Sequence, residues 1–264
     1  SSILQRLNRR ERTRPPRTPV HILHVAAGRN PVVARRDRRK GKADAWPDVP
    51  RLPESRHLQE ADGTEFRAEG VIERAILRAH QAPGTAARDL VIRESDVASL
   101  GAGAATLERS VFEDVRMAAS DFVGATLDRS RWTRVSLDGC RLSGANLDEA
   151  ALHDVAFVDC QMDHVRLEGS RLQRVSFIRC SLRGAYLMES ILERVRMIDC
   201  DLGEMDLRHA TVSETDVRQS RLEGIGLELG QFAGLTVTSE QALDLAIRIG
   251  GLSVDDHVVV PGRL

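Results

Sequence analysis

The chain repeats every five residues, without a break, from about Ile92 to Val237. Every fifth position from Leu107 onward is large and apolar, and the residue two positions earlier is small or compact. A strand alternates every two residues and a helix about every 3.6, so neither element gives this period. A chain that bends by about a right angle once per repeat does give it. Four bends close a square coil of twenty residues, and stacked coils form a solenoid.

Ladders of identical residues twenty positions apart support this coil independently. All four cysteines form one ladder: Cys140, Cys160, Cys180 and Cys200. Leucines form another: Leu107, Leu127, Leu147, Leu167, Leu187, Leu207 and Leu227. Glycines recur where a type II turn requires a positive φ, at Gly124, Gly144, Gly184 and Gly224. Between residues 87 and 237, a twenty-residue period gives about seven and a half coils.

Several repeats consist of a small residue, often an Asp or Asn, a Leu and two variable positions. Examples are ANLDE, AYLME and CDLGE, at residues 145–149, 185–189 and 200–204. In this motif the chain resembles the pentapeptide-repeat family over roughly residues 70 to 237. The resemblance implies an all-β fold, a right-handed quadrilateral β-helix with a C-terminal capping helix. It implies much less about function, because most members of the family have none assigned.

Four segments are expected along the chain. Residues 1–65 are basic, rich in Pro and Arg, and predicted to be largely disordered. Residues 66–90 are a degenerate first coil or N-terminal cap, partly helical near residues 72–80. Residues 91–237 are the β-helix, and residues 238–264 a capping helix and tail. Thr238 and Gln241 have the spacing of a capping box, and residues 252–260 are expected to add one or two strands.

Charge divides the chain. Residues 1–60 hold 15 Arg and Lys against 6 Asp and Glu, about +9, whereas residues 88–237 hold 18 Arg, no Lys and 25 Asp and Glu, about −7. No apolar run reaches the length of a membrane span, so we expect no membrane contact. Stacked cysteines run parallel and do not converge, which disfavours disulfides and a metal site. Unpaired, buried thiols favour the cytoplasm.

Catalytic chemistry is not predicted. The three histidines of the repeats, His153, His164 and His209, fall at different places around the coil, and no GxSxG, HExxH or P-loop pattern is present. Serines at the small position are expected to face inward and to bond to the backbone. We therefore predict no enzyme, no catalytic or metal-binding residues and no cofactor.

Two ladders of outward-facing residues are candidate interaction surfaces. The first is acidic: Glu108, Asp128, Asp148 and Glu168. Like charges stacked about 4.8 Å apart repel, so the ladder is either an anionic stripe that resembles nucleic-acid phosphates or an ordinary surface with local Arg pairing. The second is apolar: Val158, Ile178 and Ile198. It is either an exposed interface or a stack selected by strand packing alone.

Three functional hypotheses follow. The favoured one is a non-enzymatic cytoplasmic interaction or scaffold protein whose protein partner the sequence does not identify. The second comes from the resemblance: some pentapeptide-repeat proteins mimic B-form DNA, bind DNA gyrase and protect this topoisomerase from quinolones or peptide toxins. The third is a nucleic-acid-associated protein, with contact through residues 1–60 alone. The resemblance also implies a homodimer through the C-terminal region.

Overall fold

The computed structural model describes residues 47, 50–249 and 251. The chain divides into two units, residues 1–34 and 35–264, and all the described residues belong to the second. Most of the basic segment, and the strands expected within residues 252–260, lie outside the described residues. The nucleic-acid hypothesis, which depends on residues 1–60, therefore stays a prediction.

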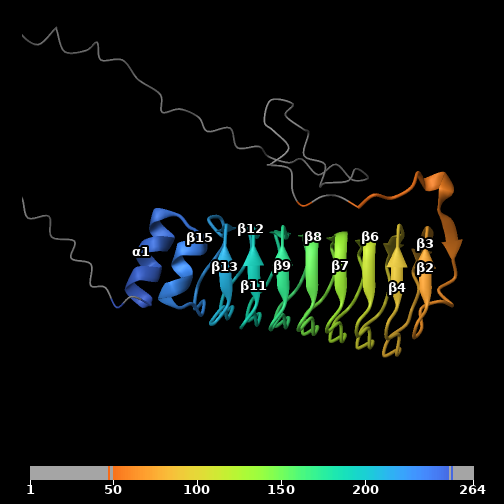
Figure 1. Ribbon diagram of the computed structural model, residues 1–264, viewed down its shortest axis with the longest axis horizontal. Coiled ribbons are helices and arrows are strands. Elements are labelled where there is room, and N and C mark those ends of the chain that lie inside the picture. The colour runs from red at the N-terminus through yellow and green to blue at the C-terminus, as the bar shows by residue number, and fades with distance from the viewer. Residues whose placement is uncertain (1–46, 48–49, 250, 252–264) are drawn as a thin grey trace, which may run out of the picture. The chain divides into compact units, whose positions relative to one another are not determined.

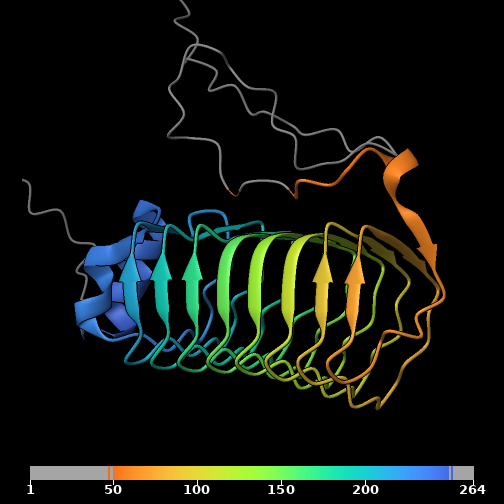
Figure 2. The ribbon, with the colours of Figure 1, turned by 45° about the vertical axis from the view of Figure 1, so that its right-hand side comes forward.

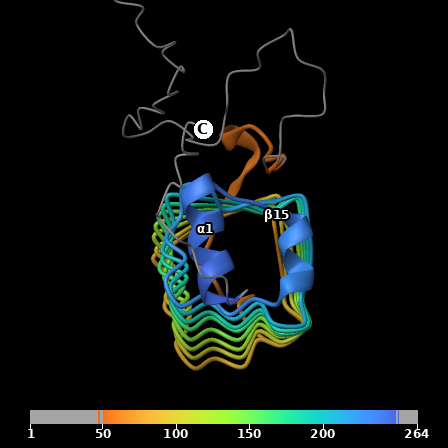
Figure 3. The same cartoon turned by 90° about the vertical axis from the view of Figure 1, so that its left-hand side faces the viewer.

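The described chain winds into a parallel β-solenoid with a square cross-section (Figures 1 and 3). Strands pair in register with residues twenty positions away, as Phe112 does with Trp132. The first pairing is the exception, since Gln59 lies beside Ala75. The order β1-β3-β5-β6-β7-β8-β10-β12-β14-β15 contains nine successive pairings. The solenoid thus has about nine turns, not seven and a half, because pairing begins well before residue 87.

The strands are short, with three that run through a corner. They are β1 (Gln59–Ala61), β2 (Val71–Glu73), β3 (Ala75–Arg78), β4 (Val91–Arg93), β5 (Asp96–Ala98), β6 (Val111–Ala118), β7 (Arg131–Asp138), β8 (Ala151–Val158), β9 (Arg171–Gln173), β10 (Ser176–Ile178), β11 (Ile191–Glu193), β12 (Arg196–Ile198), β13 (Thr211–Ser213), β14 (Thr215–Asp216) and β15 (Leu235–Thr236). The helices are η1 (Ser55–His57), η2 (Leu229–Gly234) and α1 (Ser239–Arg248). Residues 72–80 hold β2 and β3, so the helix expected there is wrong.

Four sides follow one another around each coil. The first strand side carries β2, β4, β9, β11, β13 and the first halves of β6, β7 and β8. The second strand side carries the other strands and the second halves of β6, β7 and β8. The other two sides pair through isolated bridges. The first bridge side includes Gly101 and Asp121, and the second bridge side includes Thr106 and Thr126. Figure 2 shows these sides stacking along one axis.

The core is a single apolar column inside the coils. Leu107, Leu147 and the other members of the leucine ladder are buried, as are the four cysteines. Aromatic rings stack between neighbouring coils, with centroids 4.2 Å apart for Phe112 and Trp132. Inward serines bond to the backbone as expected: the Ser170 hydroxyl donates to the Leu167 carbonyl at 2.6 Å. Burial of about 25 cal/mol per Å² makes this column the main stabilising term.

Each coil turns through residues in the left-handed region. The predicted glycines have positive φ, for example 63° at Gly124 and 66° at Gly144. Residues other than glycine occupy the same place on all four sides, as at Arg134 with φ 53° and Asp154 with φ 56°. A positive φ costs a residue with a Cβ roughly 1–2 kcal/mol, so the stacked coils must offset this strain.

Two glutamines cap the C-terminal end of the solenoid. Thr238 and Gln241 form the predicted capping box at the start of α1, and the Gln241 amide also donates to the Val217 and Ser220 carbonyls at 3.0 and 2.9 Å. The side-chain amide of Gln231, in η2, likewise donates a hydrogen bond to the Ala210 carbonyl at 2.9 Å. The helices therefore satisfy carbonyls that no further coil covers. None of the helices in the described part of the chain has the length and hydrophobicity to cross a membrane.

Candidate interaction surfaces

The acidic ladder lies on the second bridge side and is paired with arginines. Glu108 contacts Arg88 at 3.3 Å, and Asp128 contacts Arg129 at 2.7 Å. Arg166 lies between the last two members of the ladder, with an Nη2 2.6 Å from Asp148 and 3.2 Å from Glu168. The hydrogen bond to Asp148 is the largest of the effects that raise the pKa of Arg166.

Pairing with arginines reduces the negative charge that the acidic ladder presents to a partner. The side chains of Glu108, Asp128 and Asp148 are 21%, 15% and 18% exposed, and that of Glu168 is 46% exposed. Three of the four carboxylates are thus largely covered, and each has a cation beside it. A B-form duplex presents unneutralised phosphates, so the ladder resembles one only in part.

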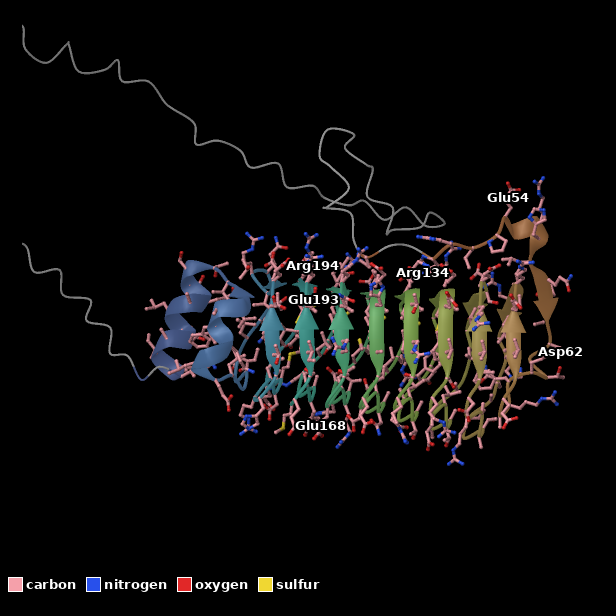
Figure 4. The ribbon with its side chains drawn as sticks, in the orientation of Figure 1. Glu54, Asp62, Arg134, Glu168, Glu193 and Arg194 are labelled. Atoms are coloured by element: carbon pink, nitrogen blue, oxygen red, sulfur yellow. The ribbon has the colours of Figure 1, made fainter. Side chains whose placement is uncertain are left out.

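A second charged ladder follows the corner between the two strand sides, opposite the acidic ladder. Figure 4 shows Arg134 and Arg194 at one edge of the solenoid and Glu168 at the other. Opposite charges form pairs along this corner: Arg74 pairs with Glu94, Arg134 with Asp114, and Arg194 with Glu214. Stacked coils bring these residues together, and they could not meet within one repeat.

Asp114 is the most enclosed carboxylate among these pairs. It accepts hydrogen bonds from Nε and Nη2 of Arg134, at 2.8 and 2.6 Å, and from the backbone N–H of Arg51 at 2.8 Å. Burial alone would raise the pKa of Asp114, but the bonds from Arg134 and Arg51 outweigh it and hold the pKa below its ordinary value.

The apolar ladder lies on the outer face of the second strand side. Ile178 pairs with Val158 on one side and with Ile198 on the other, so the three residues are in register as predicted. They differ in exposure: Val158 is only 3% exposed, while Ile178 and Ile198 are half-buried. Val158 is therefore not part of an exposed patch.

Sequence reasoning missed Tyr186, the only tyrosine in the chain. It lies on the second bridge side between Arg166 and Asp206, in the row beside that of the acidic ladder, and is 46% exposed. Half-buried Met188 follows two residues later. The other large exposed apolar side chains of the described residues lie near the ends of the solenoid: Val71, Leu229, Leu243 and Ile247. The sequence signal that could have identified Tyr186 is a lone aromatic residue at a variable, outward-facing position of the repeat.

The thiols lie in the core, and two imidazoles lie on the surface beside carboxylates. All four cysteines are free and buried. Hydrogen bonding to Cys140 and Cys180, followed by burial, raises the pKa of the Cys160 thiol. His153 and His209 each contact one carboxylate, Asp154 at 2.9 Å and Glu228 at 3.2 Å. Among the described residues, no group of three or more His, Cys, Asp or Glu is arranged to hold a metal ion.

Comparison with known proteins supports the fold. The family model of the pentapeptide repeat region matches residues 130–177. A solved structure of trypsin-treated QnrB1, a plasmid-mediated fluoroquinolone resistance protein, is 16% identical over 74% of this chain and 95% of that chain, with a TM-score of 0.51. HetL, a pentapeptide repeat protein involved in heterocyst differentiation regulation in Nostoc sp. strain PCC 7120, is 18% identical over 64% and 83%, with a TM-score of 0.32. No curated protein matches the chain.

Proposed function

Because the chain is a pentapeptide-repeat protein, we propose that it is a non-enzymatic, cytoplasmic interaction protein that binds a protein partner along its second bridge side. The main observation that supports this proposal is the exposure of Tyr186. Interface hot spots are enriched in Tyr and Arg, and Met is enriched in interfaces generally. Tyr186 is exposed on the wall of the solenoid, with Met188 on the same side and Arg166 and Arg208 in the neighbouring coils.

The electrostatic surroundings of Tyr186 suit a protein ligand. Arg166 already contacts Asp148 and Glu168, and Arg208 contacts Asp206 at 2.5 Å. Paired charges around an exposed aromatic ring form the polar rim that surrounds the apolar centre of a typical interface. Such a surface gains affinity from the ring, while the paired charges set orientation and specificity.

A capture experiment followed by affinity measurement tests this proposal. The full chain is used to isolate its partner from the native cytoplasm, and the dissociation constant is then measured for wild type, Tyr186→Ala and Ile191→Ala. Ile191 is a half-buried, outward-facing residue on the first strand side and serves as the control. We expect Tyr186→Ala to weaken binding about 30-fold, as loss of a hot spot does, and the control to change it less than threefold. Equal affinities for all three proteins would contradict the proposal.

The second candidate is mimicry of a DNA duplex toward DNA gyrase. The excess of 25 Asp and Glu over 18 Arg in residues 88–237 supports it, and so does the linear spacing of the acidic ladder. Mimicry would place the essential contacts at Glu108, Asp128, Asp148 and Glu168 and not at Tyr186. Under mimicry, neutralising those four residues would abolish binding to gyrase, and Tyr186→Ala would leave it unchanged.

A further inference from the structure

The first coil of the solenoid begins partway around the square, so its first strand side has no strand before it. β1 lies on the second strand side and pairs with β3. Residues 62–70 lead from there to β2, and the N–H of Glu69 donates to the Arg88 carbonyl of the next coil at 2.8 Å. β2 pairs with β4. In the described part of the chain, no strand pairs with the other edge of β2, at the N-terminal end of the solenoid (Figure 1).

The open edge of β2 presents backbone groups that are paired in later coils. The N–H of Val91 donates to the Gly70 carbonyl of the preceding coil at 2.9 Å. Val71 occupies the equivalent position one coil earlier, and the described residues supply no carbonyl to its N–H. Unpaired backbone groups at a sheet edge are a template for another strand. The C-terminal end differs, because the two capping glutamines bond to its carbonyls.

An apolar row on the outer face of the first strand side ends at this edge. Val71, Val91 and Val111 pair in register on β2, β4 and β6. Val91 and Val111 are half-buried, whereas Val71 is 53% exposed. β-branched side chains that stack across neighbouring strands stabilise a sheet. A strand added to β2 would therefore gain stability from a β-branched residue placed beside Val71.

A cleft of about 390 Å³ lies along the same edge, between β2 and the segment that begins with β1. Its described lining contains no Lys or Arg and has four carboxylates: Glu60, Asp62, Glu65 and Glu73. Figure 4 shows Asp62 at this end of the solenoid. Arg74, next to Glu73, is paired with Glu94. A second copy of the chain would bring a second set of carboxylates against these, so the charge favours a basic ligand.

We propose that β2 accepts a strand from a basic, extended segment of another protein, with a β-branched residue beside Val71 and a Lys or Arg beside Glu73. Strand addition of this kind gains affinity from main-chain hydrogen bonds and specificity from alternate side chains. The added strand completes the first coil, and its cation lies among the carboxylates of the cleft. This site is at the end of the solenoid and is separate from the surface around Tyr186, so the two sites can be tested independently.

A fluorescein-labelled peptide of alternating Val and Lys tests the proposal, by fluorescence anisotropy with the full chain. The reference peptide has the same sequence with N-methyl groups on every second backbone amide, which keeps the charge and prevents strand addition. We expect the unmodified peptide to bind about tenfold more tightly than the reference peptide, because only the former donates main-chain hydrogen bonds to the edge.

Two charge reversals test the place of the cation. Glu73→Lys should weaken binding of the unmodified peptide about tenfold, because repulsion replaces attraction. Glu193→Lys is the matched control and should change binding less than about twofold. Glu193 occupies the equivalent position on β11, whose two edges are both paired, and the substitution changes the net charge equally.

Val71→Pro tests the edge itself. Proline removes the N–H that faces the open edge and is tolerated at the first residue of an edge strand, so the fold should be retained. We expect wild-type circular dichroism and peptide binding weakened about tenfold. If Val71→Pro fails to fold, the comparison of Glu73→Lys with Glu193→Lys decides, and equal affinities for these two variants would contradict the proposal.

Three further results would overturn the proposal. The first is equal binding of both peptides, or binding of neither. The second is a Val71→Pro variant that retains both the wild-type fold and wild-type peptide binding. The third is self-association of the full chain, measured by sedimentation velocity, that Val71→Pro abolishes, since this result would assign the edge of β2 to a second copy of the chain.

Discussion

At the scale of single residues, position within the five-residue repeat decides the environment. The central residue and the small residue two positions before it face the column, and the residue two positions after it occupies the left-handed corner. Leu147 is fully buried, for example, and Glu149 has a φ of 57°. The effect of a substitution is therefore expected to depend on the place of the residue in the repeat as well as on the side chain that replaces it.

Replacing Leu147 by Asp is expected to unfold the neighbouring coils. Leu147 is 0% exposed, and burying an unpaired carboxylate there costs several kcal/mol. Each coil is stabilised by its neighbours, so the loss of folded structure should extend beyond one repeat. Urea denaturation followed by circular dichroism measures the effect, and Leu147→Met, which conserves volume, should cost less than about 1.5 kcal/mol. A stable Leu147→Asp protein would contradict the predicted core.

The cysteine ladder should behave as four free, unreactive thiols. All four residues are buried, and burial in apolar surroundings disfavours the reactive thiolate and shields the sulfur from reagents. We expect thiol titration to find almost none in the folded protein and four after unfolding without reductant. Two or fewer after unfolding, with air oxidation excluded, would show that disulfides are present.

At the scale of elements, the corner between the strand sides is stabilised by ion pairs that differ in burial. The side chains of Asp114 and Arg134 are 10% and 19% exposed, while those of Glu214 and Arg194 are 65% and 47% exposed. An enclosed pair is costly to break because one charge is left uncompensated, whereas an exposed pair contributes little. The two pairs share the same corner and the same spacing, so they form a matched comparison.

Asp114→Ala is expected to lower the free energy of unfolding by about 3 kcal/mol, and Glu214→Ala by less than about 1 kcal/mol. The pKa of folded Asp114 is lowered, so its stabilising effect is complete above the ordinary aspartate pKa and is lost as pH falls through the lowered value. We therefore expect the difference in unfolding free energy between Asp114→Ala and wild type, measured by urea denaturation, to be smaller at strongly acidic pH than at neutral pH. Equal effects of the two substitutions at neutral pH would contradict this account.

At the scale of the whole molecule, the sequence predicts the coil better than the surface. An apolar residue at every fifth position and the cysteine ladder determine the square column, because only one winding buries them all. Pairing across coils is harder to predict: Arg134 meets Asp114 from twenty positions away, and Arg166 reaches both Asp148 and Glu168. The burial of Val158, at an outward-facing position of the repeat, could not be predicted either.

The C-terminal end is expected to mediate a homodimer. Leu243 and Ile247 lie one turn apart on α1 and are 48% and 43% exposed. Exposed apolar side chains at the end of a solenoid favour self-association. Sedimentation velocity should show a dimer for wild type and a monomer for a Leu243→Glu, Ile247→Glu variant. A wild-type monomer at tens of micromolar would rule out this interface.

The central claim is that the surface charges are paired within the molecule, so that the solenoid binds a protein partner without imitating DNA. Competition with a labelled DNA duplex for purified DNA gyrase tests it most directly. We predict that an excess of the full chain leaves the duplex bound, because arginines neutralise the acidic ladder. The claim is contradicted if the chain displaces the duplex and a Glu108→Gln, Asp128→Asn, Asp148→Asn, Glu168→Gln variant of unchanged fold does not.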